Sequence, residues 1–378
     1  MPAPRLPDDV LKATVEAKEK YGSELAAAAA LGMPRGTFQN RLRAAAARGF
    51  APGHFDSGAA PGFTVGKVTV QRGPDGNVER TWERQAPDKE AMREAMLDVI
   101  EGLKDELVPV PPIDAPALVN ADLCNLYTFT DYHLGMYAWH SEAGADWDLA
   151  IAERVLLGAM RAMVQQSPQA HAAVINIQGD FLHTDGKLPV TPAHKHVLDA
   201  DSRYPKIRRS AIRLIRELVR MSLERHADVH LIIAEGNHDE EGAGWLADLF
   251  AVHYEEEPRL TVNDSALPFY VFQWGETMLG VHHGHKVKNE QLPLLFAAQF
   301  SEVWGRTKRR EIHCGHRHHR DEKEYNGVTV VQHPTLAARD AYAARGGWIA
   351  DRAAQAITYH KRFGQVGRVM VCPEMIES

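Results

Sequence analysis

Histidine, aspartate and asparagine residues gather at five points along the chain, each where a short apolar segment ends. The five groups are Asp131-Tyr132-His133, Gly179-Asp180, Gly236-Asn237-His238-Asp239, His282-His283-Gly284-His285 and Gly315-His316-Arg317-His318. The run Leu231–Ala234 illustrates the pattern, because it is expected to be a buried strand that ends just before the third group. In open α/β sheets, functional groups collect beyond the carboxyl ends of the strands. These residue types bind cations and move protons.

The donor types suit a centre that holds two divalent metal ions. Two such ions ~3.5–4 Å apart can clamp a phosphate ester and lower the pKa of a water molecule that attacks it. Building that centre requires one bridging carboxylate and a mixture of His, Asp and Asn from several loops, and the five groups supply the set. A chain with 20 histidines would bring several together by chance. Chance would not place them at every expected strand end, with a glycine in four of the five groups.

Taken in order, the five groups resemble the D-x-H, G-D, G-N-H-D, H-G-H and G-H-x-H signature of the calcineurin-like metallophosphoesterases. The resemblance covers roughly residues 118–335. It implies an α/β fold with a two-sheet core between flanking helices, in four layers α/β/β/α, and a dinuclear metal centre.

The same resemblance implies a role for each matching residue. The first metal would be bound by Asp131, His133 and His318, the second by Asn237, His283 and His316, and Asp180 would bridge the two. His238 would act as the catalytic residue beside the phosphate, with Asp239 as the partner that orients it. His283 is preferred to His282 because the ligand in this family directly precedes a glycine.

Four further residues beside the motifs are candidates for a substrate cleft. These are His183, Lys187, Lys288 and Arg317. Each could instead be a solvated loop residue.

Composition and charge restrict the class of protein. The chain has 378 residues, a hydrophobic fraction of 44% and a net charge of −7, so contact with nucleic acid would have to come from local patches. The three cysteines make neither a disulfide framework nor a CxxC zinc site, which fits a reducing compartment. Because no stretch of ~18 apolar residues and no apolar signal region is present, we expect a cytoplasmic protein without a membrane span.

The N-terminal region is expected to form three short helices, Asp9–Tyr21, Glu24–Leu31 and Arg35–Arg48, with a turn at Gly32-Met33-Pro34. It resembles the helix-turn-helix of bacterial and phage regulators. Residues 1–50 hold eight Lys/Arg against five Asp/Glu, an excess of three. The candidate DNA-binding residues on the third helix are Arg35, Thr37, Gln39, Asn40, Arg41 and Arg43. The alternative is an alanine-rich helical hairpin that mediates protein contacts.

We therefore expect three segments. Residues 1–50 would be the helix-turn-helix domain, residues 51–117 a linker with a β-hairpin and the amphipathic helix Asp88–Leu107, and residues 118–378 the metallophosphoesterase domain. The apolar stripe of the amphipathic helix would pack onto the large domain or against a second copy in a homodimer. Within the large domain, Trp147–Gln165, Tyr204–His226 and Leu292–Arg309 are expected to be helical.

The combination resembles phage- or prophage-encoded metallophosphoesterases of the DNA-repair exonuclease type. The leading hypothesis is a metal-dependent phosphodiesterase that hydrolyses DNA, as an exonuclease, by in-line attack of a hydroxide that bridges two metal ions. Mn²⁺ is the first choice of metal, although Fe and Zn²⁺ suit the same donors. A partner ATPase would be a separate chain. The alternatives are a phosphoesterase acting on nucleotides, cyclic nucleotides or phosphoproteins, and a DNA-binding regulator with a structural metal domain.

Overall fold

The computed structural model describes residues 6–48, 50, 63–72, 78–87, 113–192 and 195–377. They belong to two compact units, Met1–Glu106 and Leu107–Ser378. The expected amphipathic helix Asp88–Leu107 and the linker before the hairpin, residues 51–62, lie outside the described residues. None of the described helices is long and apolar enough to cross a bilayer.

The first unit contains the three predicted helices, within about one residue of their expected ends. They are α1 (Asp8–Tyr21), α2 (Glu24–Ala30) and α3 (Arg35–Ala47). The Ser23 side chain accepts a hydrogen bond from the N–H of Ala26 and so caps α2. Leu11, Phe38 and Ala45 are buried between the helices. A separate antiparallel pair of strands, β1 (Phe63–Arg72) and β2 (Val78–Pro87), forms the predicted hairpin.

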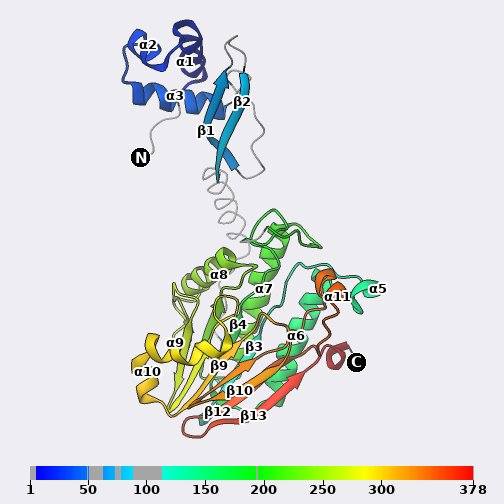
Figure 1. Cartoon of the computed structure of the whole chain (residues 1–378). Coiled ribbons are helices and arrows are strands. Elements are labelled where there is room, and N and C mark those ends of the chain that lie inside the picture. Colours follow the sequence, from blue (N-terminus) through cyan, green and yellow to red (C-terminus); the bar gives the residue numbers. More distant parts are fainter. Residues whose placement is uncertain are drawn as a thin grey trace. The chain divides into compact units, whose positions relative to one another are not determined.

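The second unit contains two mixed sheets (Figure 1). The larger has the order β13-β12-β3-β4-β5-β6, with parallel pairing from β3 to β6 and antiparallel pairing of β12 with β3 and β13. Its strands are β3 (Asn120–Phe129), β4 (Ala170–Gln178), β5 (Asp228–Ala234), β6 (Leu260–Val262), β12 (Ala354–His360) and β13 (Gly364–Val371).

The smaller sheet has the order β10-β11-β9-β8-β7, and its central strand β9 pairs in parallel with β8 and β11. Its strands are β7 (Tyr270–Trp274), β8 (Thr277–Val281), β9 (Arg309–Cys314), β10 (Asp321–Tyr325) and β11 (Val328–Gln332). The helices and one 3₁₀ turn of the unit are α5 (His140–Ala143), α6 (Leu149–Gln166), α7 (Tyr204–Leu223), α8 (Glu240–His253), η2 (Asn289–Gln291), α9 (Leu292–Gln299), α10 (Ser301–Arg306), α11 (Ala341–Gly346) and α12 (Glu374–Glu377).

The two sheets pack face to face because alternate residues of their strands are apolar. Leu126 and Val174 of the larger sheet share one buried cluster with Leu279 and Val281 of the smaller sheet. Met278, the residue directly before Leu279, faces the other way, into a cluster with α9. The helices α6 and α7 contact the larger sheet, and α9 contacts the smaller one (Figure 1). The predicted α/β fold with a two-sheet core between helices is therefore confirmed.

One predicted helix is broken. The segment expected to be helical from Leu292 to Arg309 forms α9 and α10, separated at Phe300. Phe300 leaves the helical conformation, with φ −117° and ψ 43°, and its ring lies 5.3 Å from that of Phe296. Arg309 already belongs to β9. Packing of aromatic rings against the smaller sheet thus outweighs the local helical pattern.

A buried histidine joins two strands of the larger sheet to the segment after α7. His226 is fully buried, its Nδ1 donates to the carbonyl of Ala170 at 2.8 Å, and its Nε2 lies 2.9 Å from the hydroxyl of Tyr127. Because a carbonyl only accepts, Nδ1 carries the proton and Nε2 accepts from the tyrosine. Burial lowers the pKa of His226 to about 4.

We expect His226 to make the folded state sensitive to acid. Its pKa is about 4 when folded and about 6.5 when unfolded, so the unfolded chain binds one more proton between these values. The resulting stability is complete above pH ~6.5 and is lost as the pH falls toward 4. In His226→Gln, the free energy of unfolding measured in urea should vary less steeply over this range, by up to about 1.4 kcal/mol per pH unit. Tyr127→Phe should lower stability but keep the slope, and an unchanged slope in His226→Gln would contradict this assignment.

Candidate metal centre

The polar groups that follow the strands meet at one edge of the two sheets. Asp131, His133 and His318 bring their ligand atoms within 4.8 Å of one another, and Asp180, His283 and His316 do the same. These residues follow β3, β4, β8 and β9. Parallel strands carry their carboxyl ends to the same edge, so residues distant in the sequence converge there.

The two groups adjoin each other through His283. Its Nε2 lies 3.2 Å from Oδ2 of Asp180 and 3.8 Å from Oδ1 of Asp131. In the first group, Nε2 of His318 lies 3.1 Å from the same Asp131 oxygen. The structure thus brings together six of the seven predicted metal ligands. The seventh, Asn237, lies in the loop after β5 and has a buried Oδ1 without a hydrogen-bond partner.

Five of these ligands have a left-handed backbone. The φ angles are 49° for Asp131, 48° for His133, 50° for Asp180, 72° for His316 and 55° for His318. In the described part of the chain, Lys195 is the one other non-glycine residue with positive φ. This conformation is unfavourable for residues with a side chain, and it persists where surrounding contacts impose it. The strain is therefore concentrated at the site.

Hydrogen bonds between the loops impose this conformation. The N–H of Asp131 donates to the carbonyl of Gly179 at 3.1 Å, and that of His133 donates to the carbonyl of Asp180 at 2.9 Å. The N–H of His316 donates to the Asp131 carboxylate, at 2.8 Å from Oδ2. Each ligand loop is therefore bonded to another ligand loop, and none is positioned alone.

The two buried carboxylates remain charged because imidazoles lie beside them. Burial alone would raise the pKa of Asp131, but His318 and His283 outweigh it and hold the pKa below its ordinary value. Burial opposes ionisation of Asp180 in the same way, and His283 again lowers the pKa. Burial would lower the pKa of His283, yet the two carboxylates raise it. A divalent cation would take over this positive charge, and His283 would then bind it as neutral imidazole.

The residues present fit a pair of divalent ions. Carboxylate and imidazole donors converge. The residue before His238, whose N–H donates to the Asp180 carboxylate at 2.8 Å, is Asn237, and the Oδ1 of Asn237 is buried without a hydrogen-bond partner. A buried acceptor without a protein partner is available to bind an ion or a water molecule. Mixed oxygen and imidazole donors suit Mn²⁺, Fe and Zn²⁺ alike.

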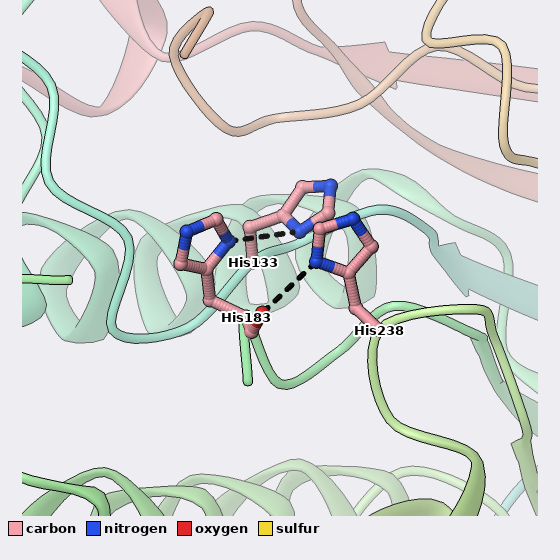
Figure 2. A group of neighbouring side chains, drawn as sticks. All are labelled: His133, His183 and His238. Carbon is pink, nitrogen blue, oxygen red and sulfur yellow. Dashed lines mark hydrogen bonds between the residues drawn. The ribbon is translucent and has the colours of Figure 1, made fainter. Parts of the chain in front are cut away.

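Three histidines lie side by side at the edge of the first group (Figure 2). Nδ1 of His133 lies 3.3 Å from Nδ1 of His183, and its Nε2 lies 3.4 Å from Nε2 of His318, so Nε2 is the nitrogen that faces the first group and could bind a metal ion. Nδ1 of His238 donates to the carbonyl of His183 at 2.9 Å, and the two rings stack with centroids 5.5 Å apart. His183 is buried and supports both neighbours, so it is not the solvated loop residue that the sequence left open.

The predicted role of Asp239 as the orienting partner of His238 is wrong. Its carboxylate accepts hydrogen bonds from the backbone N–H groups of Asp180, Leu182 and Gly236, at 3.1, 2.9 and 3.0 Å. Asp239 therefore holds the loop after β4 against the loop after β5. The His238 ring is oriented by the His183 carbonyl instead. Spacing alone could not reveal this, because it requires knowing which loop the carboxylate faces.

The side chains of His282 and His283 point in different directions, and only that of His283 faces the carboxylates of the candidate centre. His282 donates from Nδ1 to the carbonyl of Pro268 at 2.8 Å, and its ring packs against Phe269. His283 donates from Nδ1 to the carbonyl of Gln178 at 2.9 Å, which turns Nε2 toward the carboxylates. The structure thus places His283, the residue next to Gly284, at the candidate centre.

The remaining predicted residues lie at the surface. Lys187, Lys288 and Arg317 are exposed, and their role in binding a substrate stays a prediction. On α3, Arg35, Thr37, Asn40 and Arg43 are exposed, whereas Gln39 and Arg41 are half-buried. Gln39 donates to Glu24 of α2 at 2.7 Å, and Arg35 lies 3.5 Å from the same carboxylate. Gln39 and Arg35 are thus engaged with α2, and Arg43 donates to Oδ1 of Asn40 at 3.5 Å within α3, so four of the six candidate DNA contacts have partners in the helical unit.

Gly236 is required by the close approach of two loops. A Cβ at this position would collide with the carboxylate and the backbone nitrogen of Asp180. We expect Gly236→Ala to weaken Mn²⁺ binding, measured by isothermal titration calorimetry, by roughly 10–100-fold, because the Asp180 carboxylate must move. Gly244→Ala is the control, since a Cβ there meets nothing within 4 Å. Binding by Gly236→Ala equal to that of Gly244→Ala would show that the two loops do not constrain the site.

No protein-family model matches the sequence, and no similar sequence is found among curated proteins. Among solved structures, the chain is similar to a predicted phosphoesterase from Streptococcus pneumoniae TIGR4, with 10% identity, a TM-score of 0.32 and coverage of 68% of this chain and 92% of that one. An archaeal phosphodiesterase shows 14% identity, a TM-score of 0.33 and coverage of 65% and 99%. Zinc-complexed Vps29 from Entamoeba histolytica shows 13% identity, a TM-score of 0.29 and coverage of 66% and 98%. Similarity at this level defines neither the family nor the function of the chain.

Proposed function

We propose that the chain is a metal-dependent phosphoesterase with a dinuclear centre, of the calcineurin-like type that its motifs resemble. The observation that carries this proposal is the meeting of two His/Asp groups around Asp131 and Asp180, held by a strained backbone. The buried, unpartnered Oδ1 of Asn237 supports the same proposal, because it is available as a further ligand.

Each residue has a place in the proposed reaction. Asp131, His133 and His318 would hold one metal ion, Asn237, His283 and His316 the other, and Asp180 would lie between them. Two bound ions would shield the phosphate oxygens and lower the pKa of the attacking water. Nδ1 of His238 is engaged with the His183 carbonyl, so any proton that His238 gives to a leaving oxygen must come from Nε2.

We further propose that the substrate is DNA and that the metal is Mn²⁺. The helix-turn-helix resemblance of α1 to α3 and the exposed Arg43 and Asn40 on α3 support a nucleic-acid partner. The combination of a DNA-binding unit and a phosphoesterase unit in one chain favours a phosphodiester bond of DNA as the substrate. Exonuclease action, a homodimer and a separate ATPase partner belong to the same proposal.

The catalytic proposal is tested with Asp180→Asn and His238→Ala. With Mn²⁺ and end-labelled linear and closed circular DNA, both variants should lose cleavage by about 100-fold or more. Mn²⁺ content, measured by inductively coupled plasma mass spectrometry, should fall in Asp180→Asn and persist in His238→Ala. Asp248→Asn, at an exposed position on α8, is the matched control. Resistance of the closed circle would indicate an exonuclease.

The same assay separates the alternatives. Cleavage of bis-p-nitrophenyl phosphate without cleavage of DNA would contradict the DNA proposal and leave the phosphoesterase intact. Salt-dependent DNA binding without metal-dependent turnover of either compound would instead favour a DNA-binding regulator.

The DNA-binding proposal is tested with Arg43→Ala on α3. Loss of one phosphate contact should weaken DNA binding several-fold and reduce the slope of log affinity against log salt by about 1. Fluorescence anisotropy at several salt concentrations measures both, while bis-p-nitrophenyl phosphate hydrolysis should not change. Arg306→Ala, at an exposed residue of α10, is the control. Unchanged affinity and slope in Arg43→Ala would exclude this face of α3 as the DNA contact.

A further inference from the structure

A third group of potential ligands lies outside the predicted set. Glu235, Glu240 and His285 bring a ligand atom each within 4.8 Å of one another. Glu235 follows β5, Glu240 is the first residue of α8, and His285 follows β8. The group therefore joins the segments on either side of Asn237 and His238 to the loop that carries His283.

His285 is the unusual member of this group. Its side chain is only 8% exposed, and both ring nitrogens are buried without a hydrogen-bond partner. Nε2 points toward Glu240, 3.8 Å from its Oε1. Its ring lies beside that of His283, with centroids 5.3 Å apart. A buried imidazole without partners is unfavourable unless it binds something, and a metal ion would satisfy Nε2.

A lysine occupies the space between the two carboxylates. Nζ of Lys286 lies 3.0 Å from Oε1 of Glu235 and 2.9 Å from Oε1 of Glu240. The carboxylates thus already bind a cation, and both remain partly exposed, at 23% and 39%. The Lys286 side chain is 42% exposed, so its long stem can carry the ammonium into water when another cation arrives.

We propose that Glu235, Glu240 and His285 form a third divalent-cation site, in which the ion replaces the ammonium of Lys286. Two carboxylates and one imidazole are donors that Mn²⁺ and Zn²⁺ both accept, and three protein ligands leave positions for water. Binding of the ion would tie the start of α8 and the end of β5 to the loop after β8. A salt bridge of Lys286 with two glutamates accounts for the carboxylates but not for His285.

The stoichiometry of Mn²⁺ binding tests the site in the full chain. Equilibrium dialysis followed by inductively coupled plasma mass spectrometry should give three ions per wild-type chain and two in both His285→Asn and Glu240→Gln. Lys286→Met should also bind three ions. Its affinity for the most weakly bound of the three should be about tenfold higher, because the ammonium no longer competes with the ion. Glu256→Gln, at an exposed glutamate elsewhere on the surface, should retain three.

Any different number of bound ions would contradict the proposal, and the number would show why. Two ions in the wild type and in Lys286→Met would mean that the group is a salt bridge. Two ions in the wild type and three in Lys286→Met would mean that the lysine excludes the ion from the native chain. Three ions in every variant would place the third ion elsewhere. No bound ion in the wild type would overturn the dinuclear centre as well.

Discussion

Two carboxylates buried close together, those of Asp131 and Asp180, impose the main constraint on the large unit. Like charges in a site shielded from water repel each other, and each also loses its hydration. Both must therefore receive positive charge and hydrogen bonds from the protein. His283 reaches both carboxylates, His318 reaches Asp131, and the N–H groups of His316 and His238 donate to them. Five of the predicted ligands have a left-handed backbone, a strained conformation that persists where surrounding contacts impose it.

The two-sheet architecture makes this convergence possible. β3, β4 and β5 are parallel neighbours in the larger sheet, and β8 and β9 are parallel neighbours in the smaller one, so five strand ends reach the same edge. The apolar cluster between the sheets fixes the position of one sheet edge relative to the other. A slip of one residue in any of these strands would turn its apolar side chains away from the cluster. The packing of the core and the geometry of the site are therefore set by the same alternation of residues.

Residues beside the predicted ligands position the site. Asp239 bonds the loop after β4 to the loop after β5 through three backbone N–H groups. His183 holds the rings of His133 and His238 from one side (Figure 2). Gly236 leaves the space that Asp180 occupies. Partners beyond the ligands usually tune a metal site strongly, because they determine the orientation and basicity of each ligand.

The amino-acid sequence by itself determined the α/β class, the three N-terminal helices and the residues at the strand ends. These depend on local patterns, since apolar alternation and helix caps act over a few residues. It could not determine that Leu292–Arg309 breaks at Phe300, that Asp239 faces two backbone loops, or that His183 is buried. Nor could it bring Glu235 and Glu240 to His285. Only the tertiary structure decided these points, because the direction of a side chain depends on its backbone dihedral angles and on neighbours that are distant in the chain.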